Sequence, residues 1–287
     1  MNPDEAVLLW VDEYTRMADA YEANVAPRFA PFSEALVARA GLAAHATVLD
    51  VSTGTGLTAL LAAKAVGPSG LVVGIDLADG ALAVAQTKAA RAGLRNVRLE
   101  MMDSRNIVYR GGAFDAALCS FGIPAVGHAQ VFREVQRVLR DGATFHALGW
   151  GPRRPEAGWD AFDEALAAHR TASPSEALAR LREAGDLVAQ SGDAAATRDA
   201  RAITAKMRDA GFSDVDAEPR ETVVAFGTLD DLIAHQASFG TTERELGEMG
   251  ESARTAFRRD LEAGLAAYRE GEGVRLRWST VLYAAKK

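Results

Sequence analysis

A glycine-rich turn carries the residues of this chain that are best suited to chemistry. It reads Asp-Val-Ser-Thr-Gly-Thr-Gly from Asp50 to Gly56, after an apolar run and before an Ala- and Leu-rich segment. Glycine allows the backbone angles of a tight turn and lets a ligand approach the main chain closely. A helix that starts there offers free N–H groups to an anionic group. The turn therefore predicts a binding site for a nucleoside cofactor.

Two further acids stand where such a cofactor needs them. Asp76 ends the next apolar run, 76 − 56 = 20 residues after Gly56, and a carboxylate there can accept hydrogen bonds from both ribose hydroxyls. Asp103 follows the third run, where an adenine amino group could be recognised. Residues 54–59 also fit the dinucleotide fingerprint, with Ala in the third glycine place. Asp50 disfavours this NAD alternative, because it would repel a pyrophosphate and suits a cofactor with an ammonium group.

The elements around these residues alternate between apolar runs and helix-like segments, the pattern of right-handed βαβ units in an open sheet. We expect strands at 47–51, 71–75, 97–101, 114–119 and 144–148, with helices at 57–66, 79–92 and about 128–139 between them. Further on we expect a helix capped by Ser173, a loop at 191–196, helices at 198–210, 229–239 and 252–270, and strands at 221–226 and 274–283.

The ordered motifs resemble those of the class I S-adenosylmethionine-dependent methyltransferases, in the branch that modifies quinones, sterols and other small metabolites. Val48-Leu49-Asp50-Val51-Ser52-Thr53-Gly54-Thr55-Gly56 is similar to the first motif and Val73-Gly74-Ile75-Asp76 to the second. Met102-Asp103-Ser104 with Phe114-Asp115, the segment 134–142, and the N-terminal segment 18–22 match later and opening motifs. One residue departs from the pattern: Ser52 stands where the family usually has Gly, and its Cβ narrows the approach of the cofactor's methionine part.

The resemblance implies an α/β fold, a doubly wound seven-stranded Rossmann-like sheet with the last strand antiparallel, plus a helical cap. It divides the chain into a helical lid (1–46), a cofactor-binding core (47–150), a cap insertion (151–196) and a segment that completes the sheet (197–287). The implied cofactor is S-adenosylmethionine. Its expected contacts are Asp50, Ser52, Thr53, Gly54, Gly56, Asp76, Leu77, Met102, Asp103, Ser104, Ser120 and Tyr21.

The implied reaction is methyl transfer to an O, C or N nucleophile of a small, largely apolar metabolite, bound near Trp150 and Trp159 with few polar groups around it. A base is needed only for some acceptors. His128 and His146 are the candidates, because histidine alone has an unperturbed pKa near neutrality, whereas His235 is expected on the solvated surface. Cys119-Ser120-Phe121-Gly122 lacks the residues with which N-methyltransferases act on nucleobases. A non-methylating rearrangement, or a structural use of the cofactor, is the alternative.

Composition excludes several other classes. The formal net charge is −7, and no basic run exceeds two residues, so we expect no nucleic-acid partner. One cysteine and five scattered histidines predict neither a disulfide nor a metal site. No apolar run reaches the roughly 20 residues of a membrane span, so we expect a cytoplasmic protein with a small-molecule substrate. The oligomeric state is left open, with a homodimer among the alternatives.

Overall fold

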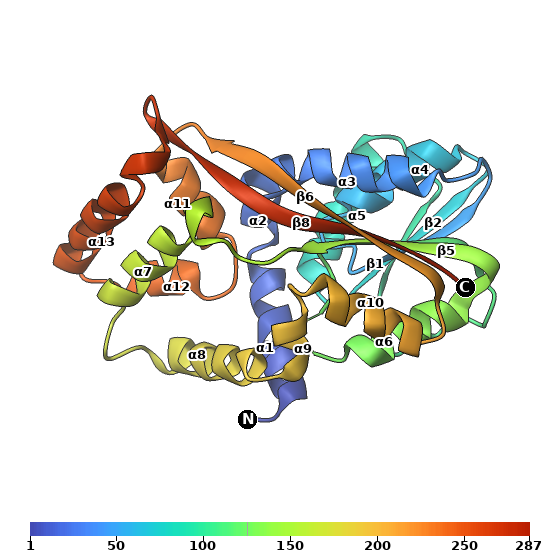
Figure 1. Ribbon diagram of the computed structural model, residues 1–287, viewed down its shortest axis with the longest axis horizontal. Helices are drawn as coiled ribbons and strands as arrows, with labels where there is room; N and C mark the ends of the chain where they lie inside the picture. The colour runs from blue at the N-terminus through green and yellow to red at the C-terminus, as the bar shows by residue number, and fades with distance from the viewer. Residues whose placement is uncertain (125) are drawn as a thin grey trace.

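The alternating runs fold into one sheet in the computed structural model, which describes residues 1–124 and 126–287. The strand order is β3-β2-β1-β4-β5-β8-β6, and a short β7 pairs with β8 (Figure 1). The strands are β1 (Thr47–Val51), β2 (Leu71–Asp76), β3 (Val97–Met101), β4 (Phe114–Ser120), β5 (Leu139–Trp150), β6 (Ser213–Phe226), β7 (Arg269–Glu270) and β8 (Gly273–Lys286).

The directions of the strands confirm the predicted fold. β1 to β5 pair in parallel, and β8 runs antiparallel between β5 and β6. Both late β-rich segments therefore complete the same sheet, as predicted, although each strand is longer than expected. The chain order reverses beside β1, which pairs with β2 on one side and β4 on the other. Ligands bind at the carboxyl ends of strands at such a reversal.

Helices cover both faces of the sheet (Figure 1). α3 (Ala26–Ala40), α4 (Leu57–Val66) and α5 (Asp79–Arg91) lie on one face, and α6 (His128–Val138) and α10 (Ala200–Asp209) lie on the other. Successive side chains of β1 point to opposite faces of the sheet, so this strand contributes to the hydrophobic core on both faces. Val48 packs with Val37 and Ala59, and Leu49 packs in the cluster that contains Val131 and Ile203.

The remaining helices form a lobe beside the carboxyl ends of the strands. They are α1 (Pro3–Arg16), α2 (Ala18–Asn24), α7 (Asp160–His169), α8 (Glu176–Ala189), α9 (Gly192–Ala196), α11 (Leu229–Ala237), α12 (Thr242–Glu248) and α13 (Glu251–Gly264), with 3₁₀ turns η1 (Pro155–Ala157) and η2 (Ala266–Tyr268). The long β6 and β8 run from the core into this lobe (Figure 1). No helix in the described ranges combines the length and the apolar character needed to cross a bilayer.

Three local predictions need correction in this lobe. The cap of α8 is Ser175, whose hydroxyl accepts from the N–H of Leu178, so the helix starts two residues beyond the predicted position. Residues 191–196 contain α9 instead of a loop, because Ser191 caps a run of alanines. The predicted helix 252–270 ends at Gly264, and η2 and β7 follow it.

Candidate cofactor and acceptor site

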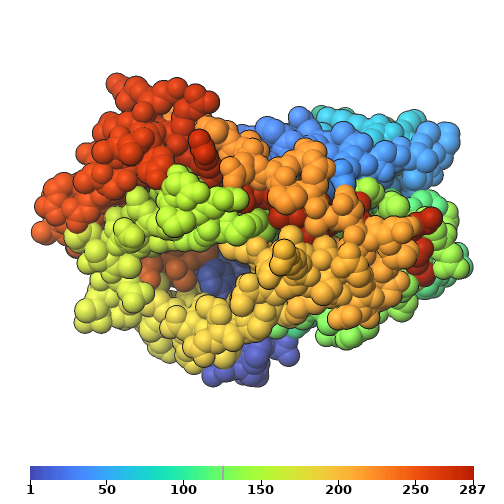
Figure 2. Space-filling model, in the orientation of Figure 1, coloured from blue at the N-terminus to red at the C-terminus, as the bar shows by residue number. Residues whose placement is uncertain are grey.

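A cavity of about 740 Å³ opens at the carboxyl ends of β1, β2 and β4. Its wall includes residues of the glycine-rich turn, of α1 and α2, and of the helical lobe. All four tryptophans of the chain, Trp10, Trp150, Trp159 and Trp278, line it. Figure 2 shows a hollow between the yellow α8 segment and the yellow-green α7 segment, with the dark blue N-terminal helix in its depth. The size suits a nucleoside cofactor together with a small acceptor.

Hydrogen bonds within the glycine-rich turn and to the end of β2 hold its backbone in place. The Thr53 hydroxyl donates to Oδ2 of Asp50 at 2.6 Å, and the Thr53 N–H donates to the carbonyl of Ile75 at 2.9 Å. Gly56 needs its glycine, because its φ is +79° and a Cβ would meet Ala85 at 2.7 Å. The backbone bends tightly enough to bring Ser52 to the cavity wall with a φ of 54°.

Asp76 lies at the end of β2 and faces the cavity. Its Oδ2 accepts from the N–H of Gly54 at 2.8 Å, and its Oδ1 accepts from the N–H of Ala78 at 3.0 Å. Burial raises the pKa of Asp76, while these backbone bonds oppose the rise. Each carboxylate oxygen has a further lone pair. Asp76 therefore fixes the turn and still has the capacity to accept hydroxyl donors from the cavity.

Asp103 contributes a second carboxylate to the same wall, but Arg105 engages it. Nε and Nη2 of Arg105 donate to Asp103 at 2.8 to 3.2 Å, and Nη1 donates to Asp4 of α1 at 2.6 Å. Burial raises the pKa of Asp103, but the bonds from Arg105 outweigh it and hold that pKa below its usual value. Asp103 thus joins the core loop to the N-terminal helix through one guanidinium.

α1 and α2 line one side of the cavity and make polar contacts with the core. The Thr15 hydroxyl donates to Asp79 at 3.0 Å, where α1 meets the start of α5. Lys88 of α5 donates to Glu22 of α2 at 2.8 Å and to the carbonyl of Thr55 at 2.9 Å. α5 therefore joins α1 and α2 to the glycine-rich turn.

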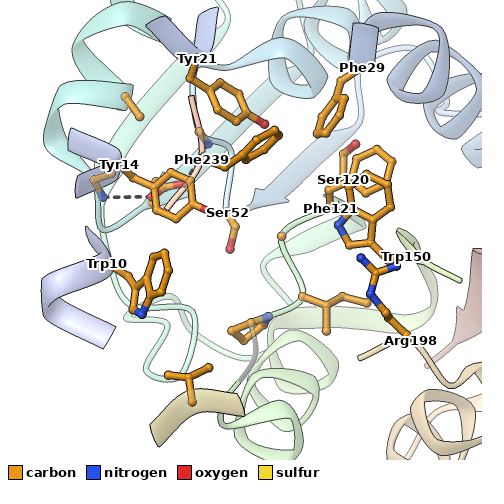
Figure 3. Close-up of a pocket in the computed structure, with 18 of the residues that line it drawn as sticks. Trp10, Tyr14, Tyr21, Phe29, Ser52, Ser120, Phe121, Trp150, Arg198 and Phe239 are labelled. Carbon is orange, nitrogen blue, oxygen red and sulfur yellow. Dashed lines mark hydrogen bonds between the residues drawn. The ribbon is translucent and has the colours of Figure 1, made fainter. Parts of the chain in front are cut away.

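Aromatic side chains form the opposite side of the cavity. The Phe121 ring lies 4.5 Å from both the Phe29 and the Trp150 ring centres, and Trp159 stacks on Trp278 at 5.7 Å. Figure 3 shows Trp10, Tyr14 and Tyr21 on one side, and Phe29, Ser120, Phe121, Trp150 and Arg198 on the other, with Ser52 between the two groups. The half with Asp76 and Asp103, called the polar half below, thus also holds the rings of Tyr14 and Tyr21. Ser52 stands between it and the half around Phe121 and Trp150, called the aromatic half.

Comparison with known proteins identifies the core. Residues 48–142 match the family model described as "Methyltransferase domain". Demethylmenaquinone methyltransferase of Listeria monocytogenes is 35% identical over 96 residues, which cover 33% of this chain and 40% of that protein. Nocamycin O-methyltransferase of Saccharothrix syringae is 28% identical over 198 residues, which cover 60% of this chain and 70% of that protein. The YcgJ protein of Bacillus subtilis aligns with a TM-score of 0.57 at 18% identity, over 89% of this chain and 98% of that one.

Residues 48–142 are a methyltransferase domain. The methyltransferase family predicted from the motifs is confirmed for this part of the chain, whereas the branch that acts on quinones and other small metabolites stays a prediction. The YcgJ structure shares the fold over 89% of this chain. The chain spans 40% of the length of the Listeria relative. Among the described residues, no group of three or more His, Cys, Asp or Glu side chains is placed to hold a metal ion.

Most of the predicted cofactor residues line the cavity, and all of these except Tyr21 belong to the methyltransferase domain. Nine of the twelve line the cavity: Ser52, Gly54, Asp76, Leu77, Met102, Asp103, Ser104, Ser120 and Tyr21. Asp50, Thr53 and Gly56 are buried within the turn and are not among the lining residues. Asp50 is 1% exposed, and its Oδ1 has no hydrogen-bond partner in the described structure. Burial raises the pKa of Asp50 to about 7, although the Thr53 hydroxyl lowers it.

The two histidines predicted as catalytic are not among the described residues that line the cavity. His128 is fully buried at the start of α6, with Nδ1 3.4 Å from Asp193. His146 is buried on β5 of the methyltransferase domain's sheet, and burial lowers its pKa to about 4. Their catalytic role stays a prediction.

His235 is the histidine that faces the cavity, and the expectation that it lies on the surface is wrong. It is 1% exposed, because α11 turns it toward the rings of Phe226, Phe239 and Trp278. Its Nδ1 lies 3.0 Å from the carbonyl of Asn24, so this nitrogen carries the proton and Nε2 keeps its lone pair. Burial lowers its pKa to about 4. No local pattern signals this position, since the surrounding rings come from distant segments.

Proposed function

We propose that this chain transfers a methyl group from S-adenosylmethionine to a nucleophilic atom of a small, largely apolar metabolite. The observation that carries the proposal is the composition of one cavity: the methyltransferase domain's turn and acids line one half, and aromatic rings line the other. A nucleoside and an apolar acceptor can therefore lie side by side there, with Ser52 at the junction.

The polar half fits the cofactor by the chemistry of its donors and acceptors. Asp76 has free acceptor capacity toward the two ribose hydroxyls, and Met102, Asp103 and Ser104 line the wall beyond it. Gly54 has a φ of +52°, and a Cβ placed there would reach nothing within 4 Å, so the backbone is open to a ligand. When bound, S-adenosylmethionine supplies an electrophilic methyl group on a sulfonium.

The chain's own contribution is alignment and exclusion of water. The lid formed by α1 and α2 closes the cofactor half through Arg105, Thr15 and Lys88. The aromatic rings surround the acceptor with apolar surface, which disfavours the entry of water. Holding two reactants in an aligned geometry removes much of the barrier of a bimolecular step. We propose that an acceptor already present as an anion reacts by alignment alone, and that a neutral one requires a histidine.

Two of the relatives support this proposal, since one is a demethylmenaquinone methyltransferase and the other is an O-methyltransferase. We retain the division into lid, core, cap and completing segment as a proposal about how the chain is organised.

Product analysis tests the proposal. Purified protein is incubated with S-adenosylmethionine and a panel of phenols, quinones and aromatic acids. The products are separated by chromatography, and their masses are measured by mass spectrometry. We expect one acceptor to gain a methyl group, with an equal amount of S-adenosylhomocysteine released. Asp76→Ala is the control and should weaken cofactor affinity by about tenfold or more, because charge-assisted hydrogen bonds are lost. Conversion of an acceptor without methyl gain would instead support the rearrangement.

A further inference from the structure

One cation on the aromatic side of the cavity forms no ion pair with any of the described residues. Arg198 stands just before α10, and its Nη1 donates to the carbonyl of Gly151 at 3.1 Å. Its guanidinium carbon lies 5.4 Å from the ring centre of Trp150 (Figure 3). Within residues 1–124 and 126–287, no ion pair includes Arg198. A guanidinium has five N–H donors in a planar fork, so most of this fork is left for another partner.

Three of the four other arginines that line the cavity form ion pairs. Arg105 pairs with Asp103 and Asp4, Arg153 pairs with Asp160 and Asp163, and Arg154 pairs with Glu221. Arg277 is in no ion pair in the described part of the chain either, but it is exposed to solvent. Arg198 is half-buried. Among the described arginines that line the cavity, it combines this partial burial with the lack of an ion pair.

The surroundings of Arg198 make an anion favourable there. Burial lowers the pKa of Arg198 and repulsion from Arg153 adds to this effect, while attraction from Asp163 opposes it without reversing it. An incompletely paired cation in apolar surroundings costs free energy, which an incoming anion recovers. Trp150 packs against the guanidinium, while Phe121 packs against Trp150. A planar fork beside aromatic rings is suited to a flat molecule that ends in two oxygens.

We propose that the acceptor is a flat, apolar molecule bearing a carboxylate, and that Arg198 binds this carboxylate through two of its N–H groups. The rings of Phe121, Trp150 and Trp278 then hold the body of the molecule. The inference rests on the proposed function, because it names the substrate class of the same cavity. It also modifies the expectation of an apolar pocket, since one wall of that pocket is cationic.

Binding of matched probes tests this inference without turnover. Calorimetry measures the affinity of 2-naphthoate and of 2-naphthalenemethanol, a neutral molecule of similar shape, for protein saturated with S-adenosylhomocysteine. We expect the wild-type protein to prefer the carboxylate by about tenfold or more. Arg198→Gln should bring the two affinities within about twofold of each other. Arg201→Gln, which removes the same charge at an exposed position outside the cavity wall, should leave the preference unchanged.

A lysine variant keeps the test decisive if Arg198→Gln does not fold. Arg198→Lys retains the charge but not the planar fork, so the preference should fall severalfold without disappearing. Equal affinities in the wild-type protein, or an undiminished preference in either variant, would overturn the inference. A separate titration of the cofactor-free protein measures S-adenosylhomocysteine binding. A missing preference with normal cofactor binding overturns the carboxylate alone, and absent cofactor binding overturns the proposed function.

Discussion

Ser52 and Gly122 occupy adjoining space at the centre of the cavity. A Cβ on Gly122 would stand 2.4 Å from the Cβ of Ser52 and 3.3 Å from Sγ of Cys119. The serine that departs from the family pattern is therefore accommodated by a glycine that comes from the loop after β4. A side chain at either position therefore restricts what can stand at the other, although the two are 70 residues apart in the sequence (122 − 52).

A double-mutant cycle tests this pairing. Gly122→Ala should lower the free energy of unfolding and the affinity for S-adenosylhomocysteine, because the new methyl group overlaps the Ser52 side chain. The same change in a Ser52→Gly background should cost less, with a coupling energy of roughly 1–3 kcal/mol. Ser52→Gly alone should have a small effect, since relief of the left-handed φ of 54° is offset by the entropy of glycine. Additive effects in chemical denaturation would contradict the pairing.

Asp50 predicts a specific dependence of stability on pH. Burial raises its pKa to about 7 from the ordinary value of 3.8. As the pH rises from about 4 to 7, the unfolded chain loses this proton first, so the group destabilises the folded state progressively over that window. Asp50→Asn, which can still accept from Thr53, should be more stable than wild type by roughly 2–4 kcal/mol at pH 7.5 in the cofactor-free protein.

The measurement is the difference between the two unfolding free energies across pH, since this difference cancels the opposite contributions of His128, His146 and His235. It should shrink toward zero near pH 4. Parallel curves for the two proteins would mean that the Asp50 carboxyl titrates normally.

The three buried histidines predict a contrast in catalysis. His235→Gln should lower kcat/KM about a hundredfold if the acceptor needs a base, because the Nε2 lone pair is lost from the cavity. His128→Gln and His146→Gln should lower the melting temperature and leave kcat nearly unchanged. Steady-state assays at saturating cofactor measure this. A loss of kcat in His128→Gln or His146→Gln at a temperature where the variant is folded would instead establish the histidine named from the sequence.

The junction of the lid with α5 predicts an effect on cofactor affinity. A Cβ on Gly80 would stand 2.3 Å from the carbonyl oxygen of Thr15. Gly80→Ala should therefore displace the end of α1 and raise the Kd for S-adenosylhomocysteine about tenfold, as expected for a clash of 1–2 kcal/mol. Gly247→Ala is the matched control, because a Cβ there meets nothing within 4 Å. Equal affinities in the two variants would show that the lid does not help to hold the cofactor.

Sequence periodicity was sufficient for the sheet because its strands are buried and bounded by clear turn residues. β1 and α4 have the predicted limits, and both closing strands join the sheet. The cap of α8 shifted because two serines flank Pro174, and only the side chain of Ser175 reaches the N–H of Leu178. Such a choice depends on backbone angles that local composition does not determine.

The acceptor side was predicted less completely than the cofactor side. The cofactor residues follow strand ends in order, so spacing alone locates them. Arg198 and His235 acquire their proposed roles from their surroundings. Arg198 lies against Trp150 and forms no ion pair with the described residues, and aromatic rings surround His235. These surroundings are built by segments far apart in the chain, and one sequence contains no signal for such tertiary contacts.

The long β8 has a consequence for how this chain can be re-engineered. Its first half carries Trp278 into the acceptor wall opposite Thr222, and its second half pairs with Phe145 in the buried sheet through Ala285. One continuous strand, β8, therefore contributes both to the acceptor site and to the buried core. If the part of β8 that lines the acceptor site were replaced by a segment of another enzyme, the pairing of β8 with β5 and β6 would be interrupted. The segment between β5 and β6 can be replaced without this, because it joins the sheet only at the end of β5 and the start of β6. Directed evolution of acceptor preference should therefore begin with α7 to α9.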